Sequence, residues 1–154
     1  MSRRDEQVAR IAALVEDGSL SVACAESLTA GGVASALARG ENAASWFRGA
    51  VVAYDSQVKF EVLGVAEGPV ITAACARQMA AGVAERLRAS VSVATTGVGG
   101  PDPEEGEPAG TVYVATYMDG RTHAVRHEFD GDPASVIEQS IDAALTQLEK
   151  ALSD

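Results

Sequence analysis

Residues 21–32, SVACAESLTAGG, contain the change of pattern on which the predicted fold depends. Four small apolar residues at 22–25 form a run of the length of a buried strand, and Thr29, Gly31 and Gly32 lie at the start of a helical pattern. A strand that ends at Ser27 in front of a helix places a hydroxyl beside backbone N–H groups that have no partner in the helix. We therefore expect an oxyanion or a phosphate to bind here. In the alternative interpretation, Ser27 or Thr29 is only the N-cap of that helix.

The composition predicts one domain over residues 1–154. Apolar residues make up 47% of the chain and aromatic residues only 5%, so the core must consist mainly of Ala, Val, Leu and Ile. The formal net charge of -10 argues against nucleic acid as a partner, because the phosphate backbone would be repelled.

The two cysteines, Cys24 and Cys75, each lie in an apolar segment and form no CxxC motif. This pattern predicts two buried free thiols in a reducing compartment. The N-terminus lacks the apolar core of a signal peptide, and no segment approaches the roughly 20 apolar residues of a membrane span. We therefore expect a cytoplasmic protein without a membrane partner.

Periodicity along the chain predicts an α/β fold in which a mixed sheet of about five strands carries helices on both faces. The Asp119-Gly120 pair between two β-rich segments indicates a hairpin, and Asp55 or Ser56 caps a short helix. The nearly continuous apolar segment at 46–54 predicts a strand that is covered on both faces. Helices are expected at 5–15, 33–40, 56–63, 72–88 and 133–152, and strands at 22–25, 46–54, 91–95, 111–118 and 122–129.

Common cofactor motifs are absent, so we predict no cofactor. The chain has no P-loop, and in the glycine loop GVGGPDP the residues Pro101 and Pro103 prevent a helix from starting where a dinucleotide would need it. The only histidines, His123 and His127, share a strand face about 13 Å apart, which is too far for one metal ion. No metal site is predicted.

Lys59 is unusual because the chain contains ten arginines and only two lysines. A lysine, unlike an arginine, can lose its proton in a folded protein. To act as a general base, Lys59 needs a pKa lowered from about 10.4 to about 7, which partial burial can achieve. In the alternative interpretation, Lys59 forms an exposed i,i+4 ion pair with Asp55 that is worth only about 0.3 kcal/mol.

Ser27 and Lys59 together form a candidate pair of hydroxyl nucleophile and amine base. Both follow the C-terminal ends of predicted strands, where ligands bind in open α/β sheets. Thr95, Thr96 and Gly97 end the third strand and are expected at the same edge, where their hydroxyl and N–H groups donate to an oxyanion or a phosphate.

Five segments resemble the motifs of the CinA C-terminal domain family, the nicotinamide-nucleotide amidases: AESLTAG at 25–31, WFRGAVVAYDSQVK at 46–59, LGV at 63–65, TGVGGPD at 96–102 and PAGTVY at 108–113. The resemblance extends over about residues 5–152. It implies a three-layer α/β/α domain that hydrolyses nicotinamide mononucleotide to nicotinate mononucleotide and ammonia, without a metal or cofactor. Ser27 and Lys59 match the catalytic serine and lysine of the family, and Tyr54 and Thr96 match its active-site partners.

The same resemblance suggests the substrate contacts. Glu26 matches the acid beside the serine and would tolerate the positive nicotinamide ring, while Arg39, Arg48 or a helix N-terminus would hold the phosphate. The residues expected to bind substrate are Glu26, Thr29, Gly31, Arg48, Gly97 and Gly100.

Two further hypotheses stay open because Pro133, Ile137 and Glu138 stand where the family pattern often has arginines. The chain is then either a nucleotide-binding or interaction domain without catalysis, or an amidase for another small carboxamide. We also expect a homodimer, because the small residues of the helix at 73–84 suit close packing against a partner.

Overall fold

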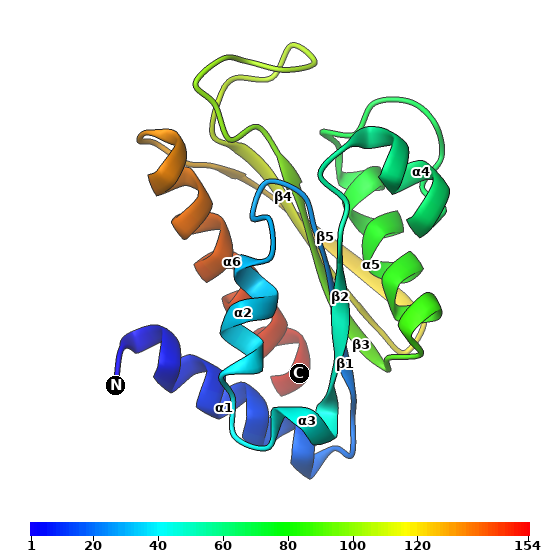
Figure 1. The fold of residues 1–154 in the computed structure, drawn as a ribbon, viewed down its shortest axis with the longest axis vertical. Coiled ribbons are helices and arrows are strands. Elements are labelled where there is room, and N and C mark those ends of the chain that lie inside the picture. The colour runs from blue at the N-terminus through cyan, green and yellow to red at the C-terminus, as the bar shows by residue number, and fades with distance from the viewer.

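A five-stranded sheet forms the centre of the computed structural model, which describes all residues 1–154 (Figure 1). The strand order is β2-β1-β3-β4-β5. β1 pairs in parallel with β2 and β3, whereas β4 is antiparallel to both β3 and β5. The predicted mixed sheet is thus confirmed. The strands are β1 (Val22–Glu26), β2 (Phe47–Val52), β3 (Val91–Gly97), β4 (Thr111–Met118) and β5 (Arg121–Glu128).

Six helices cover the two faces of the sheet, which confirms the α/β class. α1, α2 and α6 pack on one face, and α4 and α5 pack on the other (Figure 1). None of the helices combines the length and the apolar composition that crossing a membrane requires. The helices are α1 (Arg3–Asp17), α2 (Gly32–Ala38), α3 (Ala43–Trp46), α4 (Ser56–Leu63), α5 (Ala73–Leu87) and α6 (Pro133–Ser153).

The prediction that the strand at 46–54 is covered on both faces is wrong. β2 is an edge strand that pairs only with β1, and Val52 at its end is 46% exposed. Small apolar residues at an edge resemble those of a central strand, and only the pairing distinguishes the two. The sequence also did not predict α3, in which the buried Trp46 donates its indole N–H to Glu41 O at 3.0 Å.

Five loops meet at one edge of the sheet, where the parallel strands end and four helices begin. We call this the carboxyl edge; its loops are residues 27–31, 53–55, 64–72, 98–110 and 129–132. It lies at the upper end of Figure 1, where α2, α4, α5 and α6 all have their N-termini. This edge is where an open α/β sheet places a ligand.

Both cysteines are free and buried, as predicted, and they lie in different cores. Cys24 belongs to the core under α1, α2 and α6, and Cys75 to the core under α4 and α5. Small residues of α5 such as Ala76 and Ala80 are fully buried within the domain, between the helix and the sheet. The expected homodimer stays a prediction.

Candidate functional site

Ser27 and Lys59 meet at the carboxyl edge. Lys59 Nζ lies 3.0 Å from Ser27 Oγ and 3.2 Å from the main-chain oxygen of Tyr54. The lysine is only 2% exposed, and it forms no ion pair with Asp55. The alternative of an exposed ion pair is therefore wrong, because the side chain turns into the protein rather than along the helix surface.

The pairing of β1 with β2 explains why two residues 32 positions apart make contact. Glu26 and Val52 are in register, so both strands leave the sheet side by side, about 4.8 Å apart. The carboxylate of Asp55 then caps α4 by accepting from Gln57 N–H at 2.7 Å, as predicted for this position. Lys59 lies on the first turn of the helix and points back to the end of β1.

Burial is the main influence on the Lys59 amine, and it lowers the pKa of this group. The nearby carboxylates of Asp55, Glu104 and Glu105 partly oppose this effect. Cys75 lies close to the amine, and burial raises the pKa of its thiol to about 11, so the thiol is neutral at pH 7. A buried amine with a lowered pKa is suited to accept a proton from the neighbouring hydroxyl.

Glu26, not Ser27 or Thr29, satisfies the N-terminus of α2. Its carboxylate accepts from the backbone N–H groups of Val33 and Ala34, each at 2.9 Å, and the side chain is fully buried. The N-cap position itself is Gly31, which makes no side-chain cap. The N-cap interpretation of Ser27 and Thr29 is therefore wrong, because the turn at 27–31 delays the helix and brings Glu26 beside its first N–H groups.

The turn between β1 and α2 is anchored to β3 and leaves three donors free. The hydroxyl groups of Thr29 and Thr95 form a hydrogen bond at 2.8 Å, and Ser27 N–H donates to Thr95 Oγ1 at 3.4 Å. The N–H groups of Leu28, Thr29 and Gly31 donate to no acceptor in the chain. Gly31 has a φ of 97°, a conformation that glycine adopts without strain. These free donors, within four residues of Ser27, suit a developing oxyanion.

Thr96, Gly97 and Gly100 form the β3 side of the site. Thr96 is buried and donates its hydroxyl to Val70 O at 2.8 Å, so it ties the loop at 64–72 to the sheet. A Cβ on Gly97 would lie 2.5 Å from Thr111 O, so a glycine is needed for the close approach of β4. Gly100 has a φ of 90° and precedes the cis-proline of the loop at 98–110.

Three other predicted residues make no side-chain hydrogen bond to Ser27 or Lys59. Arg48 lies at the opposite end of β2 and donates to Leu87 O at 3.0 Å, at the end of α5. Arg39 ends α2 and pairs with Asp5 at 3.3 Å. Tyr54 contributes its main-chain oxygen, while the residue is 70% exposed. No arginine that the sequence suggested for a phosphate therefore reaches the hydroxyl–amine pair.

Two contacts of the site were not predicted from the sequence. The Tyr54 main-chain oxygen holds the amine, and a main-chain contact leaves no signal in residue type. The Glu105 carboxylate accepts from Val70 N–H at 2.9 Å and from Ile71 N–H at 2.8 Å, which fastens the loop at 98–110 to the loop at 64–72. In the sequence, only the acidic residues of the loop at 98–110 suggested that this loop contacts another segment of the chain.

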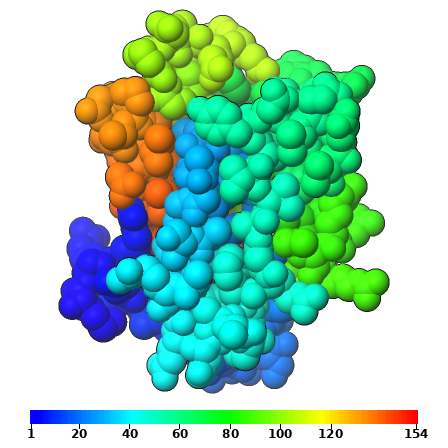
Figure 2. Space-filling view, viewed as in Figure 1, coloured from blue at the N-terminus to red at the C-terminus, as the bar shows by residue number.

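In the space-filling view, the turn at 27–31 and α2 (blue to cyan) lie between α6 (orange) and the segment from β2 to α4 (teal) (Figure 2). A groove between β5 and α6 lies elsewhere on the molecule and includes neither member of the hydroxyl–amine pair. The candidate site is therefore formed by the ends of the strands and the loops that follow them, and not by this groove.

Fold and site define an α/β protein that holds a serine and a lysine in contact at the carboxyl ends of parallel strands. The family described as CinA C-terminal domain matches residues 4–152, and the chain belongs to this family.

Relatives in sequence and structure agree with this assignment. Protein YdeJ of Escherichia coli (strain K12) is 35% identical over 139 residues, which are 86% of this chain and 81% of YdeJ. A CinA-like protein of Frankia casuarinae is 34% identical over 145 residues, 91% of this chain, but the chain spans only 34% of that protein.

Crystal structures of CinA superfamily proteins share the whole fold. The protein from Klebsiella pneumoniae superposes with a TM-score of 0.93 at 28% identity, covering 99% of both chains. The protein from Escherichia coli gives a TM-score of 0.93 at 31% identity, covering 98% of this chain and 93% of that one.

Proposed function

We propose that this chain is an amidohydrolase that converts nicotinamide mononucleotide to nicotinate mononucleotide and ammonia. The observation that carries the proposal is the 3.0 Å contact between Ser27 Oγ and the buried Lys59 Nζ. Family membership supports it, because the CinA C-terminal domain family includes amidases.

In the first half of the reaction, Ser27 Oγ attacks the carboxamide carbon while the neutral Lys59 amine takes the hydroxyl proton. The oxyanion that forms on the carbonyl oxygen accepts from the free N–H groups of the turn at 27–31. Lys59 then gives its proton to the amide nitrogen, the C–N bond breaks and ammonia leaves. The product of this half is an ester between the substrate acyl group and Ser27.

In the second half, a water molecule attacks the ester carbon and Lys59 accepts its proton. Breakage of the C–Oγ bond returns that proton to Ser27 and releases the carboxylic acid. The released acid loses its proton to the ammonia, so one amide and one water yield one carboxylate and one ammonium ion. The lowered pKa of Lys59 supports both halves, because only the uncharged amine can accept a proton.

Ammonia release from nicotinamide mononucleotide tests the proposal. We expect Ser27→Ala and Lys59→Arg each to lower kcat by roughly 100-fold or more, because arginine keeps the charge but cannot act as a base. Lys150→Arg, an exposed change in α6, is the matched control and should keep the activity of the parent.

If Ser27→Ala or Lys59→Arg kept the kcat of the parent, a catalytic role of the hydroxyl–amine pair would be excluded. If the parent released no ammonia from this nucleotide or from other small carboxamides, the domain would instead be a binding module without catalysis.

A further inference from the structure

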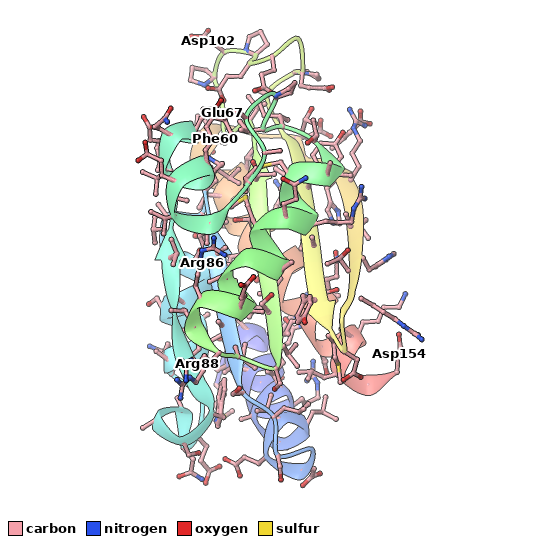
Figure 3. All side chains as sticks on the ribbon, turned by 90° about the vertical axis from the view of Figure 1, so that its right-hand side faces the viewer. Phe60, Glu67, Arg86, Arg88, Asp102 and Asp154 are labelled. Atoms are coloured by element: carbon pink, nitrogen blue, oxygen red, sulfur yellow. The ribbon has the colours of Figure 1, made fainter.

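The loops of the carboxyl edge are strongly acidic. They contain no lysine, arginine or histidine. Figure 3 labels two of the acidic residues, Glu67 and Asp102, at this end of the molecule, whereas Arg86 and Arg88 lie farther down, toward the end of α5. The eight carboxylates of these loops belong to Asp55, Glu67, Asp102, Glu104, Glu105, Glu107, Asp130 and Asp132.

In β5 and α5, the arginines nearest the carboxyl edge are Arg126 and Arg77. Arg126 of β5 is held by Glu128 at 2.7 Å and by Glu107 at 3.4 Å. Arg77 of α5 is exposed, on the side away from Cys75 and Met79, which face the core. The cationic group that contacts the reacting hydroxyl is the Lys59 amine, whose pKa is lowered by burial.

At each helix N-terminus of this edge, at least one of the N–H groups that bind anions in other proteins already donates to an oxygen of the chain. Glu26 accepts from two N–H groups of α2, Asp55 caps α4, Thr72 caps α5 and Asp132 caps α6. Glu105 occupies the N–H groups of Val70 and Ile71 in the same way. Four of these five acceptors are carboxylates, so a phosphate would add charge beside charges that are already present.

We propose, building on the amidohydrolase function above, that the site prefers a cationic carboxamide without a phosphate group. Within the pyridine carboxamides, this is the N-glycosylated nucleoside, nicotinamide riboside, rather than its 5′-phosphate. The pyridinium ring carries one positive charge, which the acidic loops attract. A phosphate monoester carries about −1.5 to −2 at neutral pH, and the same loops repel it.

The riboside and the mononucleotide form a matched pair of substrates, because they differ only in the phosphate. At low ionic strength we expect kcat/KM for the riboside to exceed that for the mononucleotide by about tenfold or more. Added salt should narrow this ratio, because it screens exposed charges that lie more than about 10 Å apart at 0.1 M.

Reversal of one charge in the loops provides a second test. Glu104 is exposed and lies close enough to Lys59 to influence its pKa, and its carboxylate forms no hydrogen bond. Glu104→Lys should raise kcat/KM for the mononucleotide severalfold relative to the riboside. Glu41→Lys makes the same change in net charge at the opposite edge, between α2 and α3, and should leave the ratio unchanged.

The outcomes separate this proposal from the amidohydrolase function. Equal or better hydrolysis of the mononucleotide at low salt overturns the charge argument while the amidase stands. If neither compound releases ammonia, the amidase is refuted, and calorimetric binding to Ser27→Ala decides the charge argument. In that case, tighter binding of the riboside upholds the charge argument. Tighter binding of the mononucleotide, or no binding of either compound, overturns the charge argument.

Discussion

Glu26 and Lys59 both have buried side chains near the candidate site, and their hydrogen-bond partners differ. The Glu26 carboxylate accepts from two backbone N–H groups of α2. The Lys59 ammonium has only a hydroxyl and a main-chain oxygen as partners. Burial lowers the pKa of Lys59, and this direction supports the proposed proton-transfer role of the amine.

The lowered pKa predicts a rising pH profile. We expect kcat/KM for ammonia release to increase with pH as Lys59 loses its proton, with an apparent pKa below the ordinary lysine value of 10.5. Initial rates between about pH 6 and about pH 10 measure this profile. A rate that is independent of pH over this range would contradict the role of Lys59 as a base.

The same shift links stability to pH. Between the lowered pKa of the folded state and 10.5, the unfolded chain binds more protons at Lys59 than the folded chain does, so the free energy of unfolding rises with pH. Relative to Lys59→Met, which has no charge at this position, the parent should therefore gain stability as pH increases through this window. Urea denaturation of both proteins at several pH values tests whether the stability of the parent relative to Lys59→Met rises with pH.

At the scale of elements, the contact between α4 and α5 holds the lysine in place. Gly82 of α5 lies against the last residue of α4, and a Cβ built on it would come within 2.1 Å of Leu63 O. The backbone of α4 can approach α5 this closely only because position 82 has no side chain. The position of Lys59 therefore depends on a glycine in a different helix.

Gly82→Ala should destabilise the domain by about 1–3 kcal/mol through overpacking, although alanine is the better helix former by roughly 0.5–1 kcal/mol. It should also lower amidase activity, because the displaced α4 carries the base. Chemical denaturation and ammonia release measure the two effects. Gly99→Ala is the control for stability, since its Cβ would meet nothing within 4 Å; equal stability of the two variants would refute the packing argument.

At the scale of the whole molecule, the sheet separates two cores that each contain one free thiol. Cys24 and Cys75 are 0% and 2% exposed, and burial raises the pKa of both thiols. Reaction with a thiol reagent requires an exposed thiolate, so the native protein protects both residues. The two cysteines can therefore report on the opening of the two layers.

We expect a maleimide at pH 8 to label both cysteines slowly and at equal rates, because a domain of this size usually unfolds as one cooperative unit. Mass spectrometry of separated peptides measures each site, and the fully denatured protein provides the reference rate. Much faster labelling of Cys75 than of Cys24 would show that the α4–α5 layer opens independently of the rest.

Local sequence signals determined much of the fold and the identity of the two central residues. Apolar periodicity located the five strands and the long helices. The helix cap at Asp55 and the Asp119-Gly120 turn each involve residues only a few positions apart in the sequence. Ser27 stood out because it ends a strand, and Lys59 because arginine is the common cation of this chain. These features depend on neighbours in sequence, which is why they were predictable.

Only the tertiary structure decided what these residues do. Whether Lys59 is buried against Ser27 or exposed beside Asp55 depends on β2 pairing in parallel with β1, a contact between distant segments. Folding also gives Arg48 a partner in Leu87 O, and the turn at 27–31 brings the Glu26 carboxylate to the N–H groups of α2. Burial, distance and the charge around a site are properties of segments brought together by folding, and local residue patterns do not contain them.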